Sequence, residues 1–194
     1  LVGRNGTISY QKASGLLVFS GIVIFCFYSF VLLKERLPVE KFGYDAVFFI
    51  LLILCFAWGG DTCAYFAGRA FGKHKLCPVV SPKKTVEGAI GGVLGTMVFG
   101  VVATLIYSIA ANRMEAFTRS NIGVSMYVII ALLACVAAVL GIYGDLFASV
   151  VKRQCGIKDY GRLLPGHGGV LDRFDSVIFA APVIWMIVDA APLY

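Results

Sequence analysis

The stretch from Gly88 to Asn112, GAIGGVLGTMVFGVVATLIYSIAAN, decides the fold class of this sequence. Its 25 residues carry no charged side chain, and a helix of that length crosses the roughly 30 Å hydrocarbon core of a bilayer. Two more charge-free stretches, Ala13 to Leu33 and Ser120 to Gly144, contain 21 and 25 residues. The sequence therefore predicts an all-α, polytopic helical membrane protein.

The overall composition supports this prediction. The 194 residues are 59% hydrophobic and 14% charged, against about 25% charged in an average soluble domain. A soluble enzyme with one ordinary core is therefore excluded. The net charge of +6 comes from basic residues in short connections between apolar stretches, so we expect anionic lipid or a phosphorylated substrate as partner and no nucleic acid.

About five membrane spans can be drawn, near residues 15–33, 46–71, 86–111, 123–151 and 170–191. The last is the weakest, because only Ser176 to Val188 is free of charge and Pro182 interrupts it. Of the 17 Lys and Arg residues, 12 fall on the side that contains the connections after the second and fourth spans. Because cytoplasmic loops carry the positive excess, both connections are predicted to be active-site loops that face the cytoplasm.

Four aspartates lie near the cytoplasmic ends of these spans: Asp61, Asp145, Asp172 and Asp175. A carboxylate at the centre of a membrane helix costs about 2.5 to 3.5 kcal/mol on insertion scales, so such acids usually face a partner, a metal or water. Any one of them alone is equally well explained as a helix-end charge paired with a nearby cation. Four acids on one side indicate a functional site.

The spacing of these acids predicts a metal and a phosphate. Asp145, Ser149 and Lys152 are spaced i, i+4 and i+7, which places them on one face of a helix. Asp172 and Asp175 are spaced i and i+3 and project from one face as well. Carboxylates on two helix ends can hold Mg²⁺, which is commonly shared with substrate phosphates.

A glycine cluster, LPGHGG at 164–169, immediately precedes the second acidic pair. Glycines let backbone N–H groups approach an anion closely, although such a cluster by itself is also typical of a flexible turn. Cations on both sides of it favour the phosphate interpretation. His167 within it is either a structural residue or a phosphate ligand and proton donor, whereas we interpret His74 as a structural or solvated loop residue.

The connection after the second span ends in SPKKTVEG at 81–88. We expect Ser81 to cap a helix whose first turn contains Pro82. Lys83 and Lys84 would then oppose the helix dipole unless an anion such as a polyphosphate lies between them. The alternative, a solvated basic loop, explains the cations but not their Ser-Pro and Thr-x-Glu-Gly frame.

Four glycines follow within the third span, at positions 88, 91, 92 and 95. Their overlapping Gly-x-x-x-Gly spacings are typical of close helix packing, so we assign them no catalytic role. Such a stripe would also support a homodimer.

The two connections together resemble the phosphatidate cytidylyltransferase family, also called CDP-diacylglycerol synthases. The resemblance rests on SVVKR at 149–153, Lys158-Asp159, PGHGGVLDRFD at 165–175, Asp61-Thr62, Gly72-Lys73 and SPKKTVEG at 81–88. Two positions depart from the family pattern. Family members often have Glu where this sequence has Ala148, and often have Ser where it has Tyr160. The family usually carries additional N-terminal spans, so residues 1–194 resemble its C-terminal catalytic part, a single integral membrane domain.

The resemblance implies that CMP is transferred from CTP to phosphatidic acid, giving CDP-diacylglycerol and pyrophosphate. It implies Mg²⁺, with two metal ions in the site and a monovalent ion as an option for one of them. The expected metal ligands are Asp145, Asp172 and Asp175, which with Lys152 and His167 form the catalytic set. The expected substrate-binding residues are Ser81, Lys83, Lys84, Thr85, Ser149, Arg153, Lys158, Gly168, Gly169, Arg173 and Asp61. The expected location is the bacterial inner membrane, with the site facing the cytoplasm.

Two other functions fit parts of the pattern. An ion- or proton-coupled transporter would also need intramembrane acids, but it predicts acids near mid-bilayer, whereas these cluster with basic loops on one side. A related cytidylyltransferase or lipid kinase acting on an isoprenoid alcohol or an ether lipid would use the same phosphate chemistry.

Overall fold

The computed structural model describes residues 10–78, 80–113, 123–161 and 169–190. Its helices are α1 (Tyr10–Arg36), α2 (Val39–Phe42), α3 (Asp45–Phe71), α4 (Val86–Arg113), α5 (Val124–Gln154) and α6 (Val177–Ala190), with a 3₁₀ turn η1 (Leu171–Arg173) before α6. Two short strands, β1 (Lys75–Cys77) and β2 (Ser81–Thr85), lie between α3 and α4. The helical fold class is confirmed.

Four of these helices, α1, α3, α4 and α5, are long and apolar enough to cross a membrane. The fifth expected span is the short apolar helix α6, which begins at Val177 and not near residue 170. The residues before Val177 that were expected to begin this span form η1 and the turn that follows it instead. Pro182 lies inside α6 and is buried.

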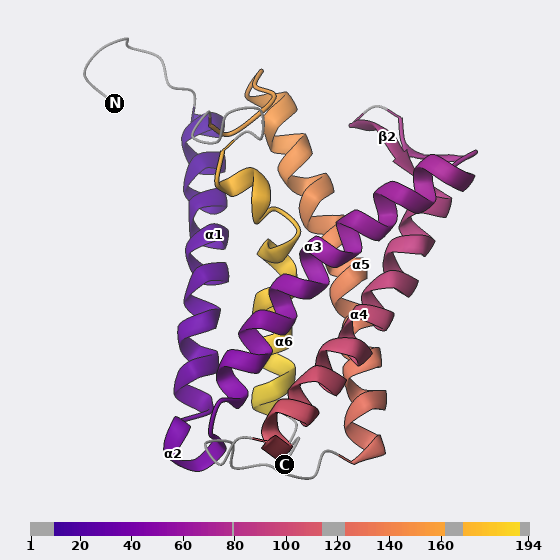
Figure 1. The fold of residues 1–194 in the computed structure, drawn as a ribbon. Coiled ribbons are helices and arrows are strands. Elements are labelled where there is room, and N and C mark those ends of the chain that lie inside the picture. Colours follow the sequence, from indigo (N-terminus) through magenta and orange to yellow (C-terminus); the bar gives the residue numbers. More distant parts are fainter. Residues whose placement is uncertain (1–9, 79, 114–122, 162–168, 191–194) are drawn as a thin grey trace.

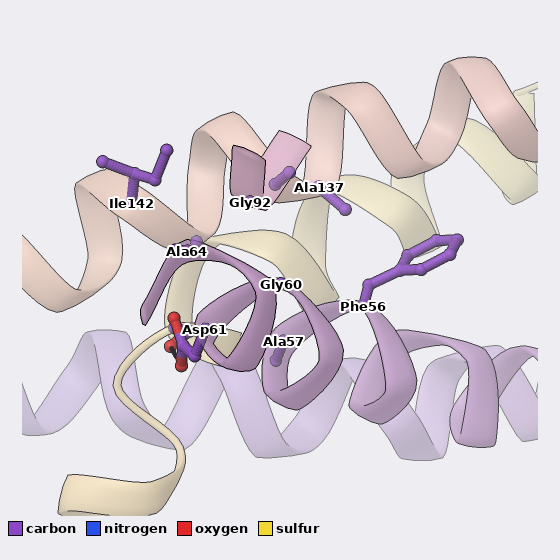
Figure 2. Close-up of a pocket in the computed structure, with 11 residues that line it drawn as sticks. Phe56, Ala57, Gly60, Asp61, Ala64, Gly92, Ala137 and Ile142 are labelled. Atoms are coloured by element: carbon purple, nitrogen blue, oxygen red, sulfur yellow. Dashed lines mark hydrogen bonds between the residues drawn. The ribbon is translucent and has the colours of Figure 1, made fainter. Parts of the chain in front are cut away.

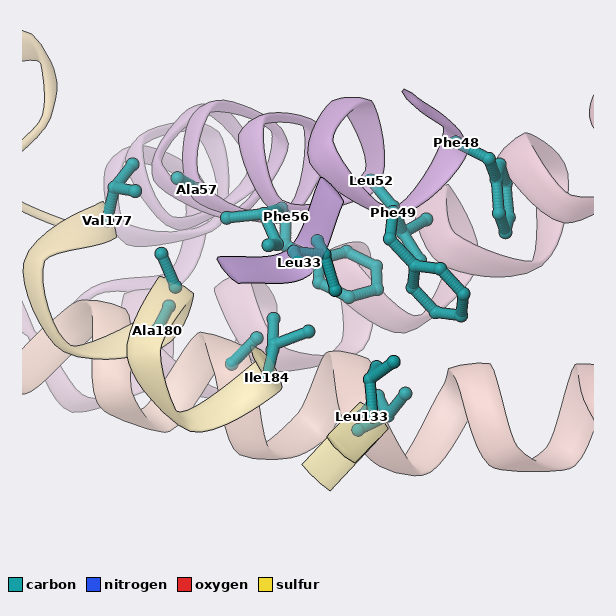
Figure 3. Close-up of a cluster of buried hydrophobic side chains, with 14 of the residues drawn as sticks. Leu33, Phe48, Phe49, Leu52, Phe56, Ala57, Leu133, Val177, Ala180 and Ile184 are labelled. Carbon is teal, nitrogen blue, oxygen red and sulfur yellow. The ribbon is translucent and has the colours of Figure 1, made fainter. Parts of the chain in front are cut away.

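The helices form one bundle in which α3 crosses obliquely in front of the others (Figure 1). Its start lies beside α1 and α2, and its end lies beside the β-hairpin at the other end of the bundle. Apolar side chains from α1, α3, α5 and α6 fill the centre, including Leu33, Phe49, Phe56, Leu133 and Ile184 (Figure 3). Figure 3 shows these side chains converging between the ribbons, which fixes α3 against α5 and α6.

The glycine stripe of α4 packs closely against another helix, as the sequence predicts, and the structure shows that this helix is α3. A Cβ on Gly91 would lie 2.2 Å from the Cβ of Ala67, and one on Gly95 would lie 2.4 Å from that of Cys63. Backbones can approach this closely only where a side chain is missing. Because α3 already occupies this stripe, the stripe does not support the expected homodimer, which stays a prediction.

The β-hairpin corrects the expected helix start. β1 and β2 pair antiparallel, with Lys75 opposite Thr85 and Cys77 opposite Ser81. Ser81 therefore lies in a strand, and the prediction that it caps the helix is wrong. Pairing with β1 keeps this segment extended, and the cap falls to Thr85, whose hydroxyl accepts a hydrogen bond from the backbone N–H of Gly88 at 3.1 Å.

Candidate active site

The predicted acids converge at the hairpin end of the bundle. Asp61 comes from α3, Asp145 from α5, and Asp172 and Asp175 from η1 and the turn before α6. The turn approaches α5 closely because a glycine faces it: a Cβ on Gly144 would lie 2.5 Å from the backbone oxygen of Asp175. Small residues of α5 thus allow the acidic turn to reach this helix.

Lys152 lies between the two acids of the turn. Its Nζ is 3.0 Å from Oδ1 of Asp172 and 3.6 Å from Oδ2 of Asp175. The same nitrogen lies 5.3 Å from the ring centroid of Tyr160, within the range of a cation–π contact. All three charged side chains are largely buried, with exposed fractions of 12% for Lys152, 7% for Asp172 and 11% for Asp175. The spacing predicts that both aspartates project from one face of a helix. They lie instead in η1 and in the turn that follows it, and both contact Lys152.

Asp172 is further held by the backbone. Its Oδ2 accepts hydrogen bonds from the N–H groups of Tyr160 at 2.8 Å and of Gly169 at 2.9 Å. Burial acts to raise the pKa of Asp172, but the hydrogen bonds from Lys152, Gly169 and Tyr160 outweigh it, so the pKa falls below its ordinary value. Asp172 is therefore a fixed anion in this arrangement.

Asp175 has the opposite electrostatics. Burial, followed by repulsion from Asp145, raises its pKa to about 7 despite the attraction of Lys152. Burial is the larger cause, and the repulsion from Asp145 and Asp61 adds to it. A bound cation would relieve this repulsion.

Lys84 connects the hairpin to α5. Its Nζ lies 2.5 Å from Oδ2 of Asp145, and the hydroxyl of Ser149 donates to Oδ1 of the same carboxylate at 3.3 Å. These side chains are more accessible than the Lys152 group, with 25% of Lys84 and 24% of Asp145 exposed. The predicted i, i+4 relation of Asp145 and Ser149 is thus a direct contact.

Asp61 borders a small cavity between α3, α4 and α5 (Figure 2). Its Oδ2 accepts a hydrogen bond from the hydroxyl of Ser176 at 2.6 Å. The cavity measures about 30 Å³, which is enough for a water molecule, and Gly60, Gly92 and Ser176 are among its lining residues. Figure 2 shows the Asp61 carboxylate near the chain that leads into α6.

The other expected substrate-binding residues differ in how far they are buried. Gly169 is buried and bonds to Asp172, and Thr85 is buried where it caps α4. Of the expected substrate-binding residues, those with exposed side chains are Lys83, Arg153, Lys158 and Arg173. Ser81 is partly buried in β2. His167 and Gly168 lie outside the described residues, so their expected roles stay predictions.

Several contacts were not anticipated from the sequence. Tyr160 bonds to Asp172 through its N–H, and its phenol donates to the carbonyl of Ala148 at 3.0 Å. Burial raises the pKa of that phenol to about 12, so it stays protonated at neutral pH. Ser176 bonds Asp61, and the indole N–H of Trp58 donates to the carbonyl of Arg173 at 3.0 Å. Tyr160 and Ala148 carried a signal in the sequence, as departures from the family pattern.

The donor chemistry of the site fits a hard cation. Asp145, Asp172 and Asp175 offer only oxygen, the ligand that Mg²⁺ prefers. Among the described residues, no three His, Cys, Asp or Glu side chains are arranged to hold one ion. Lys84 and Lys152 bind these carboxylates instead, so phosphate oxygens would have to complete a metal shell.

Comparisons with known proteins identify the family of this chain. The family model described as "Cytidylyltransferase family" matches residues 5–191. The chain is 40% identical over 140 residues to a phosphatidate cytidylyltransferase of Staphylococcus haemolyticus, covering 72% of this chain and 48% of that protein. It is 44% identical over 138 residues to one of Rickettsia bellii (71% and 56%) and 33% identical over 174 residues to one of Bacillus subtilis (89% and 57%). The chain spans about half the length of these curated relatives. With nearly its whole length matched by the family model, the chain belongs to the cytidylyltransferase family.

Proposed function

We propose that this chain carries the catalytic site of a phosphatidate cytidylyltransferase, which transfers CMP from CTP to phosphatidic acid. The observation that carries the proposal is the convergence of Asp145, Asp172 and Asp175 with Lys84 and Lys152 at one end of a helical bundle. Carboxylates and lysines interleaved in this way suit a reaction between two polyanions. Membership in the cytidylyltransferase family and the similarity to proteins named phosphatidate cytidylyltransferase support the same reaction.

In the proposed reaction, a phosphate oxygen of phosphatidic acid attacks the α-phosphorus of CTP. The bond between this phosphorus and the oxygen that bridges to the β-phosphate breaks, and pyrophosphate leaves with that electron pair. A phosphate monoester has its second pKa at about 6, so at neutral pH the phosphate that acts as nucleophile has already lost most of its second proton. The site therefore needs no strong general base.

The protein's task is to bring the two anions together. Lys84 and Lys152 are described cations in direct contact with the acids. Lys84, the more accessible of the two, would exchange part of its carboxylate contact for a phosphate contact. Arg173, Lys83, Arg153 and Lys158 lie at the exposed rim of this end and would meet the triphosphate first. Ser149 and Gly169 would donate hydrogen bonds nearer the acids.

Asp145, Asp172 and Asp175 would hold Mg²⁺. The site would contain two metal positions, and one of the two could bind a monovalent ion. The metal, when bound, screens the phosphate charges and favours in-line displacement. The low pKa of Asp172 keeps that side chain ionised at neutral pH.

The position of the site at one end of the apolar helices suits one soluble and one lipid substrate, because the acyl chains stay in the bilayer. We infer from the basic connections that this end faces the cytoplasm, because cytoplasmic loops carry the positive excess. For the bacterial relatives the membrane would be the inner membrane.

The test is the transfer of label from α-labelled CTP into a lipid-extractable product by purified protein and phosphatidic acid, with and without Mg²⁺. Metal-dependent incorporation into CDP-diacylglycerol supports the proposal. The reaction is also run with an ether lipid and α-labelled CTP, and with an isoprenoid alcohol and γ-labelled CTP, because a lipid kinase would transfer the γ-phosphate. Incorporation into one of these and not into phosphatidic acid would contradict it.

A further inference from the structure

The side chain of Glu87 binds the segment that reverses the chain between α3 and β1. Its carboxylate accepts hydrogen bonds from the N–H of Lys73 at 3.1 Å and from the N–H of His74 at 3.2 Å. Its Oε1 also lies 2.6 Å from Nδ1 of the His74 ring. One carboxylate thus fixes two successive backbone groups and one side chain of the reversal.

The reversal, β2 and the start of α4 form one connected unit. The N–H of Val86 donates to the carbonyl of His74 at 2.9 Å, which extends the pairing of Lys75 with Thr85. The Thr85 hydroxyl lies in a tight space, where a Cβ on Gly68 or on Gly72 would come within 2.9 Å of it. A displacement of Glu87 would therefore also displace β2, because Lys84 in β2 lies only three residues before Glu87 in this unit.

This unit determines where Lys84 points. Successive side chains of a strand lie on opposite faces, so the burial of Thr85 against the α3–α4 junction directs Lys84 away from that junction. On that side the Lys84 amine meets Asp145 of α5. A rotation of the hairpin about the start of α4 would move this amine out of the site.

We propose that Glu87 is a positioning residue, which clamps the reversal at Lys73 and His74 so that the hairpin presents Lys84 to the phosphate-binding site. This inference rests on the proposed function. Glu87 acts through Lys84 and touches no substrate. Its loss should therefore weaken nucleotide binding more than it slows the chemical step.

A double-mutant cycle tests the link to Lys84. Glu87→Ala should raise the KM for CTP about tenfold and change kcat by less than about threefold. In a Lys84→Met background the same substitution should add nothing to KM, because the group that Glu87 positions is already gone. Independent, multiplying effects of the two substitutions would overturn the proposal, since Glu87 would then act by another route.

Limited trypsin digestion tests the clamp without any activity measurement. In detergent, Glu87→Ala should speed cleavage after Lys75 and Lys83 about tenfold, and His74→Ala should speed it less, because only the ring contact is lost. Glu40→Ala, which removes an exposed carboxylate at the opposite end, is the matched control and should be cleaved after Lys75 and Lys83 at the rate of the parent protein. Unchanged hairpin cleavage in Glu87→Ala overturns the proposal. So does an equal acceleration after Lys41, because Glu87 would then hold the whole fold. If the transferase assay finds no activity, the digestion still decides whether the clamp exists.

Discussion

The two sides of the candidate site hold their lysines in different ways. On the side of η1, Lys152 lies between Asp172 and Asp175, and the exposed fractions of the three side chains are 7 to 12%. On the hairpin side, Lys84 meets the single carboxylate of Asp145, and about a quarter of each side chain is exposed. The first lysine comes from a long helix, whereas the second comes from a two-stranded hairpin.

This difference separates a rigid side from an adjustable one. Removing one partner of a buried ion pair leaves an uncompensated charge and typically costs about 3 to 5 kcal/mol, whereas an accessible pair contributes far less. The η1 side should therefore keep its geometry between substrate-free and bound states. The hairpin side is the one that can yield to an incoming phosphate.

The largest effect is expected from Asp172→Asn. The amide removes the negative charge but keeps an oxygen that can accept the N–H groups of Tyr160 and Gly169. Lys152 keeps Asp175 as its counter-ion, so the fold should persist. The value of kcat should fall at least about a thousandfold, because a group required for charge stabilisation is lost. Labelled-CTP transfer measures the rate and thermal unfolding in detergent measures the fold. Near-normal activity would remove Asp172 from the set of metal ligands.

A direct contrast of the two sides comes from replacing each lysine by methionine, which keeps an unbranched apolar chain. Lys152→Met leaves two buried carboxylates without their shared cation, so kcat/KM should fall about a hundredfold. Lys84→Met removes a more accessible pair, and the fall should be about tenfold. Kinetics over a range of CTP concentrations give both values. Equal losses would mean that accessibility does not separate the two sides.

The hairpin side also depends on the α3–α4 contact, which a single methyl group can probe. Gly91→Ala places a Cβ 2.2 Å from that of Ala67, so α3 and α4 must separate. Overpacking of this kind costs about 1 to 3 kcal/mol in free energy of unfolding. Gly21→Ala in α1 is the control, because nothing lies within 4 Å of its added Cβ. Thermal unfolding that is the same for both variants would refute the close packing of α3 on α4.

Whether the sequence predicts a feature of this structure depends on how far apart along the chain the interacting residues lie. Charge-free length predicts the membrane helices, and glycine spacing predicts that α4 packs closely against another helix, because both are properties of one segment. Helical spacing also predicts the contact of Asp145 with Ser149. These features need no knowledge of the rest of the fold.

The features that sequence reasoning misses depend on partners far along the chain. Ser81 and Pro82 match a helix start, and only pairing with β1 turns them into a strand. The bond from Ser176 to Asp61 joins residues 115 positions apart, and no local pattern announces it. Glu87 lies in a recognisable motif, but its role becomes visible only when the reversal at His74 folds back onto it.

The smallest effect is expected from Tyr160→Phe, which tests whether the rigid side depends on the ring or on the hydroxyl. The substitution removes the hydrogen bond to the carbonyl of Ala148 and keeps the backbone N–H that binds Asp172. It also keeps the ring beside Lys152, stacked on Phe19 at a centroid distance of 5.5 Å. The loss of one hydrogen bond should lower the free energy of unfolding by about 1 kcal/mol, with kcat/KM within about threefold of the parent. Tyr160→Ala removes the ring as well and should lower kcat/KM further, because Lys152 loses one wall of its site. If both variants lose the same activity, the hydroxyl and not the ring holds the rigid side together.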